Sequence, residues 1–254
     1  MNWWIERLEE HKDSRAIIDV LSGREDSYSN ILSMSKLLTC WQTGRRVEHL
    51  SPRLTAMTLA QMLCYYIEGD KVIVISNNHQ PDISANPLLN KVKRGLVIVT
   101  SGSTGKPKRI LHDLDKLVDA HKSSKKALRT IAFLKFDHMG GFNTVLYTLS
   151  AGGTLIVPPS LGVVDVCRSI EKYKAELLPT TPSFINLLLA AGAHETYDLS
   201  SLKIISFGTE PMPDSLLERI KSAFPNVILK QTYGMSEIGV GDCAEGWNGL
   251  LGGA

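Results

Sequence analysis

The chain has 254 residues, enough for one large domain or two tightly joined lobes around a substantial core. With 43% hydrophobic residues and a formal net charge of only +2, the composition argues against a nucleic-acid-binding protein that depends on bulk electrostatic attraction. No apolar run is long enough to cross a membrane.

The first third of the chain is predicted to be mainly helical. Apolar residues recur at helical spacing over 27–41 and over 54–67, and we expect these faces to pack in the core. A β-branched strand is expected over 71–75, and a polar surface loop over 76–90.

From residue 96 onward, predicted strands and helices alternate. The strands are expected at 96–99, 130–136, 154–157, 176–178, 203–207 and 227–232. The helices are expected at 112–126, 141–150, 163–173, 182–191 and 213–223. This alternation predicts an α/β fold with mostly parallel sheets flanked by helices. Because ligands bind outside the carboxyl ends of such strands, the loops after residues 99, 136, 207 and 232 are candidate parts of a site.

The most informative motif follows the strand at 96–99. Residues 100–108 read Thr-Ser-Gly-Ser-Thr-Gly-Lys-Pro-Lys, in which glycines allow close backbone approach, hydroxyls donate hydrogen bonds and lysines add positive charge. These properties suit a polyphosphate. A Walker loop is excluded because Gly102 and Gly105 are too close together and Pro107 replaces the metal-binding hydroxyl. A dinucleotide-binding fingerprint is excluded because no third glycine stands at the required spacing. The alternative without a function is a flexible Ser/Gly linker that carries lysines.

The run at 100–108 resembles the signature of the AMP-forming adenylate enzyme superfamily, which includes acyl-CoA synthetases, nonribosomal peptide adenylation domains and luciferases. Three later segments fall in the order of that family's motifs, at 136–141, 207–213 and 231–237. The resemblance implies the N-terminal core of the adenylating-enzyme fold, as a truncated AMP-binding core over 1–254. Its two α/β lobes would lie near 1–130 and 131–254.

The resemblance also implies a role for each motif. The residues expected to contact the nucleotide are Thr100, Ser101, Gly102, Ser103, Thr104, Gly105, Gly208, Thr209, Glu210, Tyr233 and Gly234. The residues expected to be catalytic are Lys106, Lys108, Ser236 and Glu237, with Glu237 also holding Mg²⁺. His138 and Met235 would border the acid substrate, with Phe142 and Phe184 as further lining candidates. From the residues alone, a substrate contact by His138 and a loop histidine that caps the next helix are equally favoured.

The activity implied by this resemblance is that of an acid–thiol ligase. A carboxylate attacks the α-phosphate of ATP, pyrophosphate leaves, and the acyl-AMP then passes its acyl group to coenzyme A or to the phosphopantetheine of an acyl carrier protein. The carboxylate is already ionised at neutral pH, so catalysis should be mostly positioning and electrostatic stabilisation. The small carboxylic acid could be fatty, aromatic or an amino acid, whose ammonium group Asp137 could pair.

Two residues of the family pattern have no counterpart in this chain. The family's ribose-binding aspartate and the lysine of its C-terminal domain match no residue here, so we expect that domain to be absent from the chain or to be a separate chain. The alternative function is therefore a catalytically incomplete module or scaffold that binds a nucleotide or acyl-AMP. A kinase with a P-loop is disfavoured by the missing Walker spacing.

The remaining observations concern location and metals. The N-terminus lacks a basic segment followed by an apolar core, which argues against a secretory signal. The four cysteines show no CxxC spacing and the histidines no zinc-binding spacing. We therefore expect free thiols in a cytoplasmic protein.

Overall fold

The computed structural model describes residues 2–38, 46–76, 87–100, 108–208 and 210–232. Its strands are β1 (Arg15–Asp19), β2 (Arg24–Ser27), β3 (Val47–Leu50), β4 (Val72–Ile75), β5 (Gly95–Thr100), β6 (Lys108–Asp113), β7 (Arg129–Ile131), β8 (Thr154–Val157), β9 (Leu177–Thr180), β10 (Ile204–Phe207) and β11 (Ile228–Gln231). Its α-helices are α1 (Trp3–Glu10), α2 (Tyr28–Leu38), α3 (Ala56–Glu68), α4 (Leu114–Asp119), α5 (Met139–Ser150), α6 (Val163–Tyr173), α7 (Pro182–Ala190), α8 (Ala193–Thr196) and α9 (Asp214–Ala223). A short 3₁₀ helix, η2, covers Pro87–Lys91.

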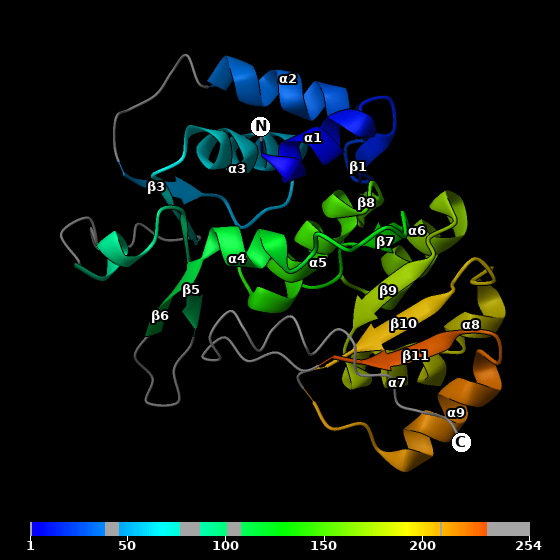
Figure 1. The fold of residues 1–254 in the computed structure, drawn as a ribbon. Helices are drawn as coiled ribbons and strands as arrows, with labels where there is room; N and C mark the ends of the chain where they lie inside the picture. Colours follow the sequence, from blue (N-terminus) through cyan, green and yellow to red (C-terminus); the bar gives the residue numbers. More distant parts are fainter. Residues whose placement is uncertain (1, 39–45, 77–86, 101–107, 209, 233–254) are drawn as a thin grey trace.

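Two sheets carry the described part of the chain (Figure 1). The larger has seven strands in the order β11-β10-β9-β7-β8-β1-β2, and the smaller has four in the order β3-β4-β5-β6. All pairings are parallel except β1 with β2 and β5 with β6. The predicted fold class, α/β with mostly parallel sheets flanked by helices, is confirmed.

The sheets do not follow the expected lobe boundary near residue 130. Strand β1 pairs in parallel with β8, with Ile17 opposite Leu155, so that residues 15–27 join the sheet built from residues 129–231. The smaller sheet is formed by strands that lie between these two parts of the sequence.

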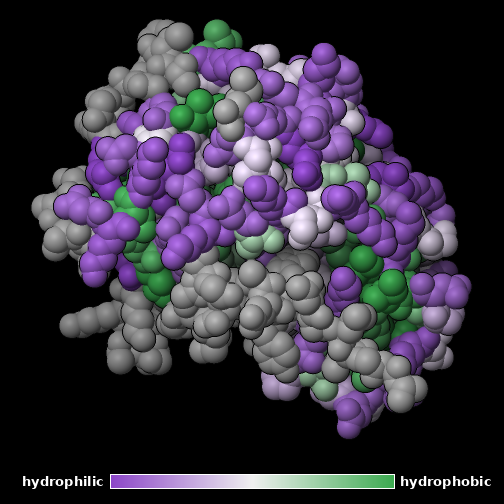
Figure 2. Space-filling model, viewed as in Figure 1, coloured by the Kyte–Doolittle hydropathy of each residue, from purple (hydrophilic) through white to green (hydrophobic). Residues whose placement is uncertain are grey.

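One hydrophobic core is shared by both sheets. It contains Ile17 and Leu155 from the larger sheet, Ile73 and Leu96 from the smaller sheet, and the fully buried Phe142 of α5. A second core covers the other face of the larger sheet, where α6, α7 and α9 pack. Figure 2 shows mainly hydrophilic side chains over the N-terminal helices, as expected when their apolar faces turn inward.

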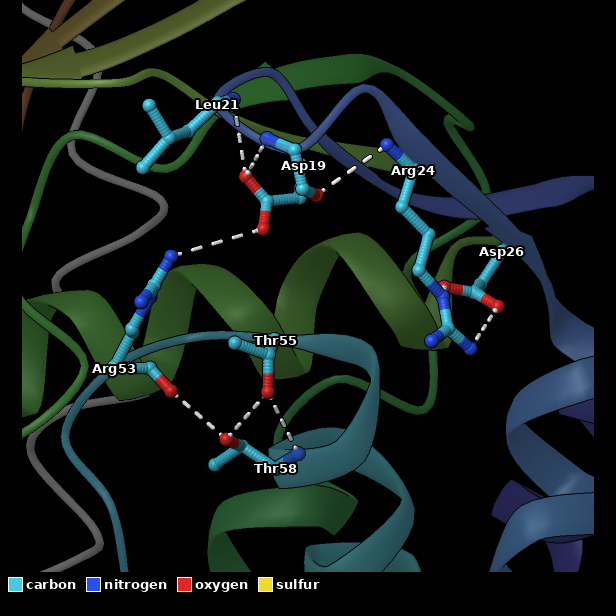
Figure 3. A network of polar contacts seen from close by, with 8 residues as sticks. Asp19, Leu21, Arg24, Asp26, Arg53, Thr55 and Thr58 are labelled. Carbon is cyan, nitrogen blue, oxygen red and sulfur yellow. Dashed lines mark hydrogen bonds and ion pairs between the residues drawn. The ribbon is translucent and has the colours of Figure 1, made fainter.

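A polar network connects the segments that carry the two sheets (Figure 3). Asp19, at the end of β1, faces Arg53 of the β3–α3 connection, with Oδ2 4.0 Å from a guanidinium nitrogen. The Arg53 carbonyl accepts the Thr58 hydroxyl at 2.8 Å, and Thr55 Oγ1 accepts the Thr58 amide at 3.1 Å. The loop that leads from β3 into α3 is thereby held beside the end of β1.

The helix predicted over 112–126 begins two residues too early and ends seven residues too late, because α4 covers only Leu114–Asp119. Residues 108–113 instead form β6, which runs antiparallel to β5, and α4 begins only at Leu114. Asp113 ends the strand and caps the helix, because its carboxylate accepts the amides of Asp115 and Lys116. The strand predicted over 130–136 is also shorter, since β7 ends at Ile131.

The first third contains elements that apolar periodicity did not predict, namely α1 and strands β1, β2 and β3. The expected surface loop over 76–90 lies largely outside the described residues, although its end forms η2. Within the described parts of the chain, no helix is both long and apolar enough to cross a membrane.

Candidate functional site

The carboxyl ends of four parallel strands meet at one edge of the larger sheet. Strands β7, β9, β10 and β11 run in the same direction, and Phe207 lies opposite both Thr180 and Gln231. The ends of β9, β10 and β11 are therefore level, whereas β7, whose Thr130 lies opposite Leu177, ends at Ile131, before the level of Thr180. The loops that follow residues 207 and 232 leave from this edge, as the sequence predicted. The loop expected after residue 136 begins already after Ile131, and the loop expected after residue 99 leaves the smaller sheet at the end of β5.

The ends of β10 and β11 are in close contact at Gly208. The Thr232 amide donates to the Phe207 carbonyl at 2.8 Å, and the Thr232 hydroxyl lies 3.2 Å from the same oxygen. A β carbon at Gly208 would come within 2.5 Å of the Thr232 carbonyl oxygen. Only glycine fits this approach, so the chain leaves the ends of β10 and β11 side by side, at Gly208 and Thr232.

The loop after β10 is also attached to α7. Oε2 of Glu210 accepts the Ser183 amide at 3.1 Å and the Ser183 hydroxyl at 2.5 Å. Thr181 caps the same helix, since its hydroxyl accepts the Phe184 amide at 3.2 Å. The Glu210 carboxylate therefore binds one of the free amides at the start of a helix, where negative charge is favoured.

His138 lies at the N-cap position of α5 but makes no side-chain cap hydrogen bond. Its Nδ1 is 2.8 Å from Oδ1 of Asp137, and 65% of its side chain is exposed. The His138 ring therefore does not cap α5 and contacts Asp137 instead. Gly141 lets the first turn of α5 approach the preceding loop, because a β carbon there would stand 2.0 Å from the Lys135 carbonyl oxygen.

The two phenylalanines considered for the acid pocket are buried in the hydrophobic cores. Phe142 is fully buried and stacks on Phe136, with ring centroids 5.5 Å apart. Phe184 is 7% exposed and packs against Phe133 at 4.4 Å. Phe142 is therefore a core residue. At the carboxyl end of β9, the hydroxyl oxygen of Thr180 is buried and has no hydrogen-bond partner among the described residues.

The polyphosphate motif begins and ends on paired strands. Thr100 at the end of β5 lies opposite Lys108 at the start of β6, so the intervening residues join the two strands of a hairpin. The expected site residues outside the described part of the chain are Ser101, Gly102, Ser103, Thr104, Gly105, Lys106, Thr209, Tyr233, Gly234, Met235, Ser236 and Glu237. Within the described part, no group of three or more His, Cys, Asp or Glu residues could hold a metal ion.

Sequence reasoning missed Ser183 and Thr232 as residues of this edge. Ser183 follows Pro182, an ordinary helix start, and nothing in the local pattern indicates that its amide and hydroxyl meet Glu210. Thr232 lies within the motif at 231–237, next to Tyr233, but its contact with Gly208 depends on the pairing of β10 with β11. Both contacts are tertiary.

A family model described as AMP-binding enzyme matches residues 94–249, more than half of the chain. The chain belongs to the AMP-binding enzyme family. The matched range contains the motifs at 100–108, 136–141, 207–213 and 231–237; the last of these is the tyrosine motif.

Curated relatives align with most of this chain. The chain is 25% identical to 4-coumarate--CoA ligase-like 5 of Oryza sativa subsp. japonica, over 75% of this chain and 39% of that protein. It is also 25% identical to Acyl-CoA synthetase 7 of Caenorhabditis elegans, over 84% of this chain and 49% of that protein. The chain thus spans less than half the length of these curated relatives.

Solved structures share the fold. The N-terminal domain of FACL13 from Mycobacterium tuberculosis superposes with a TM-score of 0.74 at 16% identity, covering 93% of this chain and 77% of that one. The anthranilate CoA ligase AuaEII in complex with anthranoyl-AMP gives a TM-score of 0.70 at 17% identity, covering 92% of this chain and 59% of that one. The predicted N-terminal adenylating-enzyme fold is thereby confirmed.

Proposed function

We propose that this chain is the nucleotide-binding core of an AMP-forming acid–thiol ligase. It would activate a carboxylic acid as acyl-AMP with release of pyrophosphate, for transfer to the thiol of coenzyme A or of a carrier protein. Membership of the AMP-binding family supports the nucleotide part of this proposal. Curated relatives whose names are those of CoA ligases and an acyl-CoA synthetase support the acid and the thiol acceptor.

The observation that carries the proposal is the close contact of Gly208 with Thr232. It brings together the start of the loop that would line adenine and the residue that precedes Tyr233, whose ring would stack on the base. Two motifs separated by more than twenty residues in the sequence therefore begin at the same place, at the sheet edge where ligands of α/β proteins bind.

In the proposed reaction, a carboxylate oxygen attacks the α-phosphorus of ATP. A bond forms between the carboxylate oxygen and the α-phosphorus. The bond between the α-phosphorus and the oxygen that it shares with the β-phosphorus breaks, and pyrophosphate leaves with that electron pair. In the second step a thiolate attacks the acyl carbon and AMP leaves. No proton is removed from the acid, so the chain's contribution is to hold anions in line and to spread their charge.

Residue roles follow the motifs and are proposals. The residues of 100–105 would cradle the β- and γ-phosphates, with Lys106 and Lys108 supplying positive charge. Ser236 would donate to the α-phosphate, and Glu237 would hold Mg²⁺, which adds positive charge beside the phosphates when bound. His138 and Met235 would border the acid.

Pyrophosphate exchange into ATP, assayed over a panel of fatty, aromatic and amino acids, tests this function. Acid-dependent exchange supports the ligase. A second candidate is a module that binds nucleotide or acyl-AMP without turnover. Nucleotide binding without exchange for any acid would favour that module, and the absence of both would refute the two proposals together.

Calorimetric titration with ATP tests the assigned residues. Replacing Lys106, Lys108 and Tyr233 together by alanine should abolish measurable ATP binding. The variant loses two positive charges that would contact the phosphates and the ring that would stack on the base. Replacement of the exposed Lys122 and Lys125 by alanine is a matched control for removing positive charge, and it should leave the affinity unchanged. Unchanged ATP binding in the triple variant would contradict the assignment.

A further inference from the structure

Glu210 uses its carboxylate at the start of α7. The carboxylate accepts both the amide and the hydroxyl of Ser183, at 3.1 and 2.5 Å. Pro182, the residue before, has no amide hydrogen, and Thr181 takes the amide of Phe184. Glu210 thus satisfies the one early amide of α7 that the helix's own cap leaves open.

The short loop that ends at Glu210 is consequently held at both ends. Gly208 is fixed against the end of β11 by its approach to Thr232, and Glu210 is fixed to α7 by Ser183. A free carboxylate at this edge would repel the phosphates of a nucleotide. The hydrogen bonds to Ser183 hold that charge at the start of α7.

We propose that Glu210 is a positioning residue: through Ser183 it sets the loop of residues 208–210 against which the base of the nucleotide lies, without touching the nucleotide itself. This inference rests on the proposed function, and it refines the role given to Glu210 by family resemblance. It also couples the loop after β10 to the helix after β9, so a residue of α7 that does not contact the nucleotide influences nucleotide affinity.

Titration calorimetry of the chain with AMP tests this coupling. Glu210→Ala should weaken AMP binding about tenfold and Ser183→Ala about threefold, because the serine variant keeps the backbone donor. The double variant should bind no more weakly than Glu210→Ala, since both changes break one connection. Ser183→Thr keeps the hydroxyl and the amide and should restore the affinity of the unsubstituted chain.

Thr55→Ala is the control for a purely structural effect. Thr55 caps α3 by accepting the Thr58 amide at 3.1 Å, so its loss also removes a hydrogen bond at a helix start. It should lower the urea midpoint in the same way as Ser183→Ala while leaving AMP affinity unchanged.

Three results would overturn the inference. Unchanged AMP affinity in Glu210→Ala would show that the loop does not need this connection. A loss in Glu210→Ala with none in Ser183→Ala, or additive losses in the double variant, would mean that Glu210 contacts the nucleotide directly. Failure of the unsubstituted chain to bind AMP is a different result, which removes the proposed function and this inference with it.

Discussion

Gly208 and Thr232 are in contact through their backbones at the carboxyl ends of neighbouring strands. A β carbon at Gly208 would lie 2.5 Å from the Thr232 carbonyl oxygen and 2.8 Å from its hydroxyl oxygen. The carbonyl belongs to the main chain and cannot swing aside as a side-chain tip could. Any side chain at 208 must therefore displace the end of β11, from which the tyrosine motif continues.

Gly208→Ala should lower the free energy of unfolding by about 1–3 kcal/mol and should weaken AMP binding, because the ends of β10 and β11 must separate. Urea unfolding and titration calorimetry measure the two effects. Gly192→Ala is the matched control: its backbone has a φ of 63° but a β carbon there meets nothing within 4 Å. That variant should lose stability through backbone strain alone. Wild-type AMP affinity in Gly208→Ala would contradict the role of this contact.

Two adjacent glycines at the start of α5 should respond very differently to alanine. A β carbon at Gly141 would lie 2.0 Å from the Lys135 carbonyl oxygen, whereas one at Gly140 would lie 3.2 Å from a terminal methyl of Leu134. Gly141→Ala should cost about 2 kcal/mol or more, because backbone must move. Gly140→Ala should be near neutral, since the gain in helix propensity of about 1 kcal/mol offsets mild crowding. Equal urea midpoints for the two variants would refute this reading of the loop.

Elements with a strong local pattern were predicted well from the sequence. Helix α6 was predicted over 163–173 and β8 over 154–157, and both match the structure. In α6 the apolar side chains of Val166 and Ile170 recur at helical spacing and are fully buried, so the pattern and the packing agree.

Elements that depend on distant partners were not predicted. Strand β6 exists because its residues pair with β5, with His112 opposite Leu96, and a six-residue segment with three charged residues carries no strong strand signal of its own. In the same way β1 is ordered by pairing with β8 far along the chain. For the site, the glycine at 208 was identified from its motif, but its partner Thr232 and the attachment of Glu210 to Ser183 became visible only in three dimensions.

A charged cluster lies at the amino ends of the strands in the larger sheet, and it should contribute to stability alone. Glu176 accepts the Arg129 amide at 3.0 Å and the Lys203 ammonium at 2.5 Å, and so joins the starts of β7, β9 and β10. Burial would raise the pKa of Glu176, but the hydrogen bonds from Lys203 and Arg129 outweigh it and bring the pKa below its usual value.

Glu176→Gln should lower the free energy of unfolding by about 1–3 kcal/mol, because it weakens the hydrogen bonds that the buried carboxylate accepts from the Arg129 amide and the Lys203 ammonium. AMP affinity should not change, since this edge lies at the far end of the strands from Gly208. Glu218→Gln serves as control, because the Glu218–Lys221 pair is exposed and should contribute less than about 0.5 kcal/mol. A reduced AMP affinity in Glu176→Gln would show that the two edges are coupled.

Two buried histidines should make the fold sensitive to mild acid. Burial lowers the pKa of His112, whose Nε2 is buried without a hydrogen-bond partner among the described residues. Burial also lowers the pKa of His121, and the hydrogen bond with Asn143 opposes that effect only in part. In the unfolded chain both rings take up a proton near pH 6.5.

Below that pH the unfolded state binds protons that the folded state resists, so the free energy of unfolding should fall as the pH decreases from about 6.5 toward the folded-state pKa values. Urea midpoints should be constant between pH 7.5 and 8.5 and should drop at pH 5.5. His112→Leu removes one of the two rings from a buried face where Leu96 is its neighbour across the strands, and should therefore reduce the drop. A His112→Leu variant that loses as much stability between pH 7.5 and 5.5 as the unsubstituted chain would exclude His112 as a source of this dependence, because no ring would remain at that position to be protonated.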